Sequence, residues 1–303
     1  MRKEALDTVY ELAKIDKKII FIGSDLGHET LKDMKESLPD QFFMEGISEQ
    51  HIVGFAAGLA MEGYVPFINT IANFFSRRAL EQIILDVALH NLPVKFLASG
   101  GGMVYAPLGP THTATDDLAH LLTVPNLRVY APCDAKEMTE IILFESGKKG
   151  PAYVRFGKGD EKIISVNFSV YDKFSIKTLG DIDSECMIVT TGITTHVALE
   201  FVNKILTQHK PLLVHLTNLN LSEFVELVSL MSNKKKILII EEHQTFGGLL
   251  TQFLHFAHSR KIRIDNISSL SLPFKFIHNY GSQKEHLDHW GLSVARINEW
   301  WKS

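Results

Sequence analysis

One glutamate stands at the start of an otherwise apolar stretch. In the segment EQHIVGFAAGLAMEG, which begins at Glu49, apolar side chains recur at the 3.6-residue spacing of a helix. Gly54 and Gly58 leave little bulk on this helix, so another backbone can approach it closely. Two interpretations stay open. Glu49 complements the positive end of the helix dipole, or it is a buried carboxyl at a subunit interface that exchanges a proton with a weakly basic ring nitrogen.

A glycine-rich loop is the second candidate for chemistry. The segment SGGGMVYAPLGPTHTATDDLAH (99–120) follows an apolar run that is typical of a strand, and it contains His112 in the sequence GPTH. Parallel α/β sheets bind ligands beyond the carboxyl ends of their strands, which makes this a candidate binding loop. The alternatives are a mobile connection without a ligand, and a helix that simply begins at Thr115 and Asp116.

Several protein classes are excluded by absent motifs and by composition. No GxGxxG follows a strand pattern and no GxxxxGK[ST] occurs, so nucleotide binding of the dinucleotide or P-loop kind is not indicated. The 31 Lys and Arg against 35 Asp and Glu leave no polybasic patch, and we expect no nucleic-acid partner. No apolar run approaches the roughly 18 residues of a membrane span. Cys133 and Cys186 match neither a disulfide framework nor a metal-ligand spacing, so we expect a cytoplasmic protein.

Short apolar runs alternate with longer amphipathic ones, which predicts an α/β fold with two parallel-type sheets covered on both faces. We expect two domains, at 1–160 and 184–303, joined by a linker or short extended meander at 161–183, where the helical period is lost. Strands are expected at 17–23, 65–71, 92–99, 127–132, 151–156, 185–191, 211–217, 235–243 and 262–268. Helices are expected at 49–63, 76–91, 134–146, 193–208 and 222–232, and from about Phe246.

The ordered motifs resemble a known family. The chain is similar to the pyrimidine-binding domain of transketolases, followed by the transketolase C-terminal domain, and the resemblance covers essentially its whole length. The segments that carry it are GISEQHIVGFAAGLAMEG, FINTIANFFSRRALEQIILDVA, GPTHTATDDLA, VPNLRVYAPCDAKEM, VTTGITTHVALE and LIIEEHQTFGGL.

The resemblance implies thiamine diphosphate as the cofactor. Glu49 holds the place of the family glutamate that hydrogen-bonds N1′ of the cofactor's aminopyrimidine. Proton exchange there activates the thiazolium carbon, which attacks a ketose carbonyl so that a two-carbon unit passes to an aldehyde acceptor. The cofactor supplies the electron sink, and the protein supplies proton placement and geometry.

The resemblance also implies roles for six further residues. Phe74 matches an aromatic that packs on the pyrimidine, Asp25 an aspartate near the cofactor, and Ile71 a position that is aromatic in the family. His112 matches a histidine that contacts the substrate and acts in catalysis, and Arg2 matches an arginine that reaches the substrate's phosphate. A second phosphate-binding arginine of the family is matched by Lys158, or by Arg155 if the alignment is shifted.

Some family positions are altered here. Arg77 stands where the family has a further aromatic of the pyrimidine pocket, and Gly100 stands where it often has a histidine. Leu108 takes the place of an aspartate just before GPTH, and Glu29 falls near a serine of the phosphate site. A site that loses polar groups meant for one substrate usually accepts another. We therefore expect a donor or acceptor other than the standard phosphorylated sugars.

The diphosphate half of the cofactor site is missing. In the family a GDG motif and a later Asn hold Mg²⁺ and the diphosphate, and no GDG occurs in this chain. Magnesium requires such a set of oxygen ligands. The resemblance therefore implies the β-type, C-terminal subunit of a split transketolase, with no metal ligand of its own, active only with a partner subunit that carries the diphosphate domain, as an α₂β₂ heterotetramer.

Three other functions compete with ketol transfer. A 1-deoxyxylulose-5-phosphate-synthase-like activity would decarboxylate pyruvate, and the ISEQH segment is similar to that branch too. A 2-oxoacid dehydrogenase β subunit shares the domain pair, but its corresponding loop normally carries a His-Ser-Gln type motif rather than GPTH. A catalytically idle homologue that serves as a scaffold is the remaining alternative.

Overall fold

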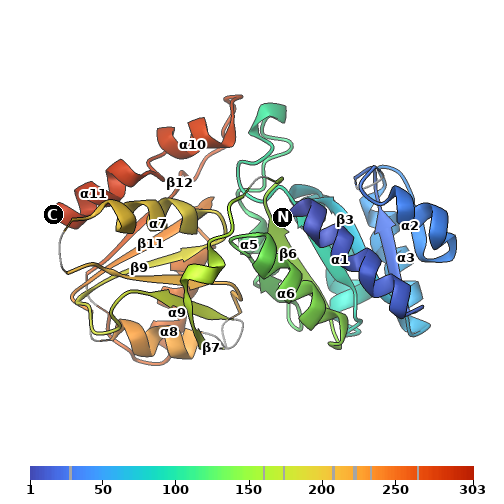
Figure 1. Cartoon of the computed structure of the whole chain (residues 1–303), viewed down its shortest axis with the longest axis horizontal. Coiled ribbons are helices and arrows are strands. Elements are labelled where there is room, and N and C mark those ends of the chain that lie inside the picture. The colour runs from blue at the N-terminus through green and yellow to red at the C-terminus, as the bar shows by residue number, and fades with distance from the viewer. Residues whose placement is uncertain are drawn as a thin grey trace.

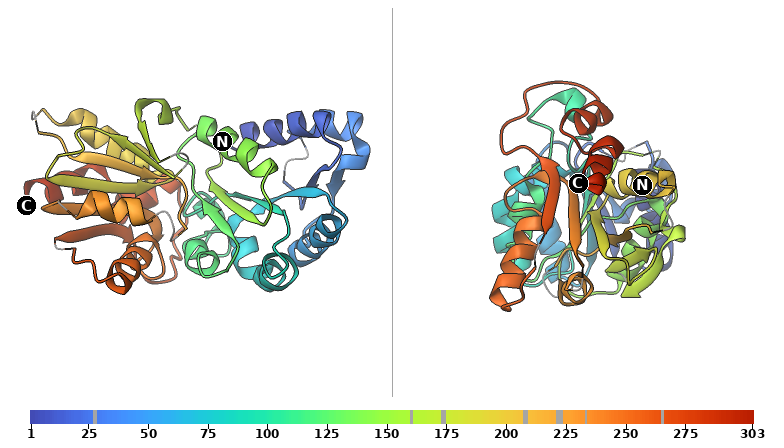
Figure 2. Two further views of the ribbon diagram at one scale, coloured as in Figure 1. Left: turned by 90° about the horizontal axis from the view of Figure 1, so that it is seen from below. Right: turned by 90° about the vertical axis from the view of Figure 1, so that its left-hand side faces the viewer.

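Two α/β lobes lie side by side in the computed structural model, which describes residues 1–26, 29–159, 161–172, 175–206, 209–220, 224–232, 234–264 and 266–303 (Figures 1 and 2). The first lobe contains one six-stranded sheet with the strand order β2-β1-β3-β4-β6-β5, and the second contains another with the order β12-β11-β9-β10-β8-β7. The expected fold class, two parallel-type α/β sheets, is confirmed. No helix among these residues is long and apolar enough to cross a membrane.

All strands of the first sheet run parallel. Uninterrupted apolar runs form its central strands because both faces are covered, and every residue of β1 is buried. Its strands are β1 (Ile19–Gly23), β2 (Phe42–Met44), β3 (Val65–Ile71), β4 (Lys95–Ser99), β5 (Arg128–Tyr130) and β6 (Ala152–Phe156).

Helices cover both faces of this sheet. One face packs on α1 (Arg2–Ile15) and α6 (Ala135–Ser146), through residues such as Leu6, Phe21 and Met138. The other face packs on α3 (Glu49–Met61) and on the helical stretch after β3, through residues such as Ile22, Val53 and Phe75. Also present are α2 (Lys32–Ser37), α4 (Leu80–Gln82), α5 (Asp117–Leu121) and the short turns η1 (Pro39–Gln41), η2 (Phe74–Arg78), η3 (Ile83–Ala88), η4 (Ala106–Leu108) and η5 (Ser165–Asn167).

The second sheet has a parallel part, with β7 and β8 added antiparallel at one edge. Its strands are β7 (Ser169–Asp172), β8 (Ile176–Leu179), β9 (Cys186–Thr191), β10 (Leu212–Leu216), β11 (Lys236–Gln244) and β12 (Ile267–Leu272). One face packs on α7 (Thr194–Lys204) and α11 (Val294–Lys302), and the other on α8 (Phe224–Met231) and α9 (Leu249–Ser259). α10 (Gln283–His289) lies near the loop of η4 (Figure 1).

Three element predictions need correction. The helix expected at 76–91 is divided, with wide π turns at η2 and η3 around α4, and it already begins at Phe74. The last strand runs over Ile267–Leu272 rather than 262–268, because Ile262 and Ile264 pack against the core before the ladder starts. The segment 161–183, expected to be a linker or a short extended meander, contains the antiparallel strands β7 and β8, and β8 joins them to the second sheet by pairing with β10. The limits 1–160 and 184–303 stay a prediction.

A buried polar cluster joins the two lobes. The Glu137 carboxylate, on α6 of the first lobe, accepts hydrogen bonds from Lys177 Nζ at 2.9 Å, His215 Nε2 at 2.8 Å and the Thr217 hydroxyl of the second lobe. The backbone N–H of Cys133 donates to the same carboxylate at 2.7 Å. A buried charge requires such partners, so this cluster fixes the lobes relative to each other.

His243 provides a second joint, and its proton can be placed from its bonds. The backbone N–H of Ala119 donates to Nε2 at 3.2 Å, so Nδ1 carries the proton and donates to the Gln244 carbonyl at 2.8 Å. Burial lowers the pKa of His243 from 6.5 to about 4, because protonation of Nε2 would charge a fully buried ring.

We expect His243 to stay neutral in the folded protein down to about pH 4. Between pH 6.5 and 4 the unfolded chain gains a proton that the folded chain does not, so His243 removes up to about 3 kcal/mol of stability as the pH falls. Glu241 acts in the opposite sense, because burial raises its pKa from 4.5 to about 7. The measurement is therefore the free energy of urea unfolding of wild type minus that of His243→Gln, determined at several pH values from 7 to 4. A difference that does not change with pH would contradict the assignment.

Candidate active site

Glu49 lies where the strand order of the first sheet reverses. β1 is flanked by β2 and β3. At the carboxyl edge of these strands, Ser24 follows β1, Thr70 lies near the end of β3, and Glu49 comes after β2. Open α/β sheets bind their ligands at such a switch point. Glu49 is the first residue of α3, and only 1% of it is exposed although it is a carboxylate.

The Glu49 carboxylate is held from two sides. The Thr70 hydroxyl donates to Oε1 at 3.4 Å, and the Arg78 guanidinium donates from Nη1 to Oε2 at 2.6 Å. The Ser24 hydroxyl lies 2.9 Å from Thr70 Oγ1 and 3.0 Å from a carboxylate oxygen of Asp25. The Ser24 hydroxyl can donate to only one of these two oxygens at a time, and Asp25 itself is exposed.

Phe74 and His112 complete the cluster. The Arg78 guanidinium lies over the Phe74 ring, 4.3 Å from its centroid, and the ring of His112 meets Phe74 edge-on with 5.3 Å between centroids. Both rings are partly exposed. The structure thus brings together Glu49, Phe74 and His112, which are far apart in the sequence.

The loop that carries His112 is fixed rather than loose. Arg77 of η2 binds both carboxylate oxygens of Asp116 at 2.9–3.2 Å, and the Asn73 amide donates to the Thr111 carbonyl. The glycine run is also tightly packed. Gly100 has a φ of +79°, and a side chain there would collide with Tyr105. These contacts give the loop a defined conformation beside Glu49.

The remaining predicted site residues lie in different places. Ile71 ends β3 beside the cluster and is 7% exposed. Arg2 and Lys158 lie together in a separate groove of about 680 Å³. Acidic residues line that same groove, namely Glu4, Asp7, Glu29 and Asp33. Lys3 also lines the groove and pairs with Asp7 at 2.6 Å, so three cationic side chains face four carboxylates, which weakens phosphate binding there.

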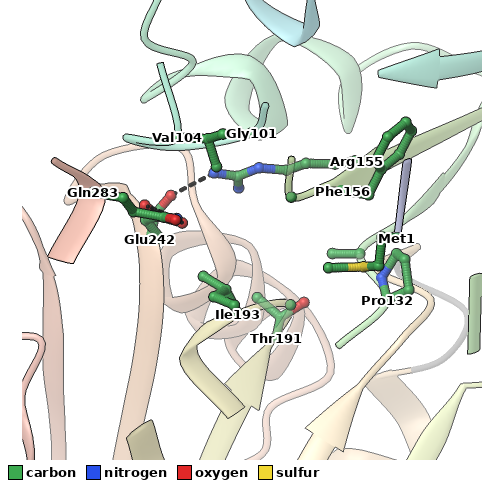
Figure 3. Close-up of a pocket in the computed structure, with 13 residues that line it drawn as sticks. Met1, Gly101, Val104, Pro132, Arg155, Phe156, Thr191, Ile193, Glu242 and Gln283 are labelled. Carbon is green, nitrogen blue, oxygen red and sulfur yellow. Dashed lines mark hydrogen bonds between the residues drawn. The ribbon is translucent and has the colours of Figure 1, made fainter. Parts of the chain in front are cut away.

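A narrow cleft lies between the lobes (Figure 3). It lies at the carboxyl ends of β6 and β9, and about 30 Å³ of it is open, which is room for one or two water molecules. Arg155 crosses this cleft and donates to the Glu242 carbonyl at 2.6 Å, while its Nε lies 3.4 Å from Asp117. Arg155 is therefore a buried contact between the lobes, whereas Lys158 is exposed.

One group among the described residues has the composition of a metal site. Cys133, Glu137 and His215 place ligand atoms within 4.8 Å of one another, and all three are buried. Lys177 already occupies the Glu137 carboxylate, and burial raises the pKa of the Cys133 thiol, which disfavours the thiolate that a metal requires. Magnesium prefers an all-oxygen set, so this cluster is the lobe joint described above.

Sequence reasoning missed Arg78, Thr70 and Ser24. The signal available for Arg78 was a pair of arginines in a mostly apolar helix, but only Arg77 was singled out because it replaces a family aromatic. Arg78 and Glu49 are 29 positions apart, so no helical or strand spacing pairs them.

Could these residues receive a cofactor pyrimidine? The Arg78 guanidinium shows which kind of group these residues bind. It is a planar cation with N–H donors; it stacks on the Phe74 ring and donates a hydrogen bond to Glu49. A protonated aminopyrimidine offers the same two properties, a flat π-face and an N–H donor. The donor set therefore fits the pyrimidine end of thiamine diphosphate.

The fold is a two-lobe α/β protein with a buried carboxylate and two aromatic rings gathered at the switch point of its first sheet. The family pattern described as "Transketolase, pyrimidine binding domain" matches residues 1–162. The chain is 30% identical to a subunit of the apulose-4-phosphate transketolase of Phocaeicola vulgatus, over 98% of this chain and 94% of that protein. The chain therefore belongs to the transketolase family, and the resemblance found in its motifs is confirmed.

Other relatives agree with this family. A 1-deoxy-D-xylulose-5-phosphate synthase of Geobacillus sp. is 32% identical over 96% of this chain, which spans only 46% of that enzyme. A solved structure named "Split gene transketolase, inactive beta4 tetramer" aligns with a TM-score of 0.82 at 26% identity, covering 99% of this chain and 96% of that one. The transketolase of Campylobacter jejuni shares the fold, with a TM-score of 0.79 at 17% identity over 97% of this chain and 45% of its own.

Proposed function

We propose that the chain is the pyrimidine-binding subunit of a cytoplasmic, two-subunit, thiamine-diphosphate-dependent enzyme that transfers a two-carbon ketol unit from a ketose to an aldehyde. The observation that carries the proposal is the buried Glu49 at the sheet's switch point, with Phe74 and His112 beside it. The relative named as a subunit of apulose-4-phosphate transketolase supports it, because that protein matches nearly end to end.

In this proposal each residue has a separate task. When bound, thiamine diphosphate supplies a nucleophilic carbon and an electron sink. Glu49 holds a proton at N1′ of the pyrimidine or returns it, and Thr70 keeps its carboxylate in place. Phe74 and Ile71 provide the apolar walls against which the ring packs, and Asp25 supports Ser24 behind Thr70.

His112 is the proposed substrate contact. Its Nδ1 lies 2.9 Å from the Thr111 hydroxyl, which leaves Nε2 to meet a substrate hydroxyl or carbonyl. Arg2 and Lys158 remain the proposed substrate-binding cations, in a groove whose four carboxylates favour a substrate group less charged than a phosphate.

The diphosphate and Mg²⁺ require a partner. In the part of the chain that the structure describes, no oxygen-rich set suited to Mg²⁺ accompanies the Glu49 cluster. We therefore propose a partner subunit with the diphosphate domain, in an α₂β₂ complex. The open face of α3 supports this, since a side chain added at Gly58 would meet no atom of this chain.

Copurification with the product of the adjacent or co-expressed gene, followed by calorimetry with thiamine diphosphate and Mg²⁺, tests the proposal. We expect binding by the complex only, at about one cofactor per αβ pair, because each chain carries half of the site. Tight binding by this chain alone would mean that a diphosphate site exists within it. No binding in either state would favour the scaffold alternative.

Synthase-like chemistry is the second candidate, supported by the 1-deoxy-D-xylulose-5-phosphate synthases among the relatives. The two reactions differ in their donor. Release of CO₂ from pyruvate by the loaded complex would identify this second function or the 2-oxoacid dehydrogenase alternative, whereas ketol transfer from a ketose releases none.

A further inference from the structure

Arg78 is placed differently from the arginine beside it. Arg77 is bound through both carboxylate oxygens of Asp116 and holds the His112 loop. Arg78 instead reaches Glu49, with its guanidinium stacked on Phe74, and 45% of its side chain is exposed. Two adjacent cations of the same type therefore have separate partners.

The ion pair gives Glu49 a strong partner within the chain. Its side chain is only 1% exposed, and the other bond that its carboxylate accepts, from Thr70, is long at 3.4 Å. A buried carboxylate without a close donor is costly, so Arg78 stabilises the site while nothing else fills it.

The same contacts are the ones that a pyrimidine would need. A guanidinium and an aminopyrimidine are both planar, stack on aromatic rings and present N–H donors to a carboxylate. Both cannot use Glu49 Oε2 and the Phe74 ring together. Because Arg78 is long, flexible and half exposed, it can turn outward without disturbing the core.

We infer that Arg78 is an internal stand-in for the cofactor, which occupies the pyrimidine's place on Glu49 and Phe74 until the cofactor displaces it. The inference rests on the proposed function. It adds a regulatory property of the site. While Arg78 is in place, other planar nitrogen heterocycles cannot bind Glu49 and Phe74, and binding of the cofactor during assembly must break one ion pair. The apparent affinity for the cofactor is reduced by the fraction of time that Arg78 is in place.

Calorimetry of thiamine diphosphate binding to the full complex tests this inference. We expect Arg78→Gln and Arg78→Ala to bind the cofactor about tenfold or more tightly than wild type, because the competing contact is gone. The matched control is Arg296→Gln, which removes an equally charged, exposed arginine paired with Glu299 on α11. It should leave the dissociation constant unchanged.

The opposite outcomes separate the inference from the function it rests on. If wild type binds and the Arg78 variants bind equally or more weakly, Arg78 is part of the loaded site and the inference fails alone. If no variant and no wild-type complex binds the cofactor, both fail.

A second measurement needs only the folded chain. In a double-mutant cycle of Glu49→Gln and Arg78→Gln, the midpoints of thermal unfolding should be non-additive, with the double variant more stable than the two single losses imply. Additive losses would show that the ion pair does not hold the empty site, and would overturn the inference.

Discussion

Replacement of Glu49 by glutamine in the assembled complex is expected to lower kcat by at least about 100-fold. Glutamine keeps the size and a hydrogen-bonding oxygen, but it cannot exchange a proton with the pyrimidine nitrogen. The buried position of Glu49, with Thr70 on one oxygen, means that no neighbouring carboxylate can take its place at that point. Steady-state kinetics with a ketose donor and an aldehyde acceptor measure the effect.

The matched control is Glu45→Gln. Glu45 lies just before α3 and is more exposed than Glu49, and its carboxylate lies 3.3 Å from His51 Nε2. It should change kcat by less than about twofold, since surface pairs contribute little. Cofactor binding by calorimetry must accompany both measurements. If Glu49→Gln turns over as fast as wild type, the chain supports an assembly without doing chemistry, and the scaffold alternative holds.

Replacement of Glu137 by glutamine is expected to reduce the free energy of unfolding by about 3–5 kcal/mol, which is typical for removal of one member of a buried charge cluster. The change leaves Lys177 and His215 buried at the lobe joint without the carboxylate that both contact at 2.8–2.9 Å. Urea unfolding at pH 7 measures it. The effect exceeds what ordinary surface substitutions cause, because the buried Lys177 ammonium and the buried His215 ring lose the carboxylate that they share.

Glu140→Gln is the control for Glu137. It removes a carboxylate on the same helix that lies 3.6 Å from the same lysine, but the Glu140 side chain is 37% exposed. A loss below about 1 kcal/mol is expected for it. Equal losses for the two variants would show that the joint does not depend on Glu137.

The pH dependence of the Glu137 effect has a defined sign. Burial by itself raises the pKa of this carboxyl, but His215, Lys177 and Thr217 together hold the pKa well below the usual 4.5. A depressed pKa in the folded state gives stability that is present above about pH 4.5 and is lost as the pH falls below it. The difference between wild type and Glu137→Gln should therefore shrink in acid.

Local patterns predicted most elements because their causes are local. The strand predicted at 65–71 is found at Val65–Ile71. A short apolar run between a glycine turn and a polar stretch is typical of a strand in a sheet that is covered on both faces. The division of the helix after β3 was not predicted, because its periodicity does not show the long-range contacts of Arg78 with Glu49 and of Phe74 with His112. The strands β7 and β8 were missed as sheet members because β8 joins the sheet through β10, which follows only after β9 and α7, and β7 pairs with β8 alone.

The candidate site divides in the same way. The motifs around Glu49 and His112 identified the family, because each motif is a run of neighbouring residues that can be recognised without the fold. They could not show that Arg155 is a buried strut between the lobes rather than a phosphate ligand, a role that depends on Glu242 and Asp117.

The amino-acid sequence by itself determined the α/β class, the family, and the positions of Glu49, Phe74 and His112 along the chain. Only the tertiary structure decided that Arg78 lies on Glu49 and Phe74, that Arg77 fixes the His112 loop, and that Glu137 joins the lobes. The physical reason is the range of each interaction. Periodicity and turn chemistry act over a few residues, whereas the choice of a buried carboxylate's partner depends on which distant side chains the folded core brings within hydrogen-bonding distance.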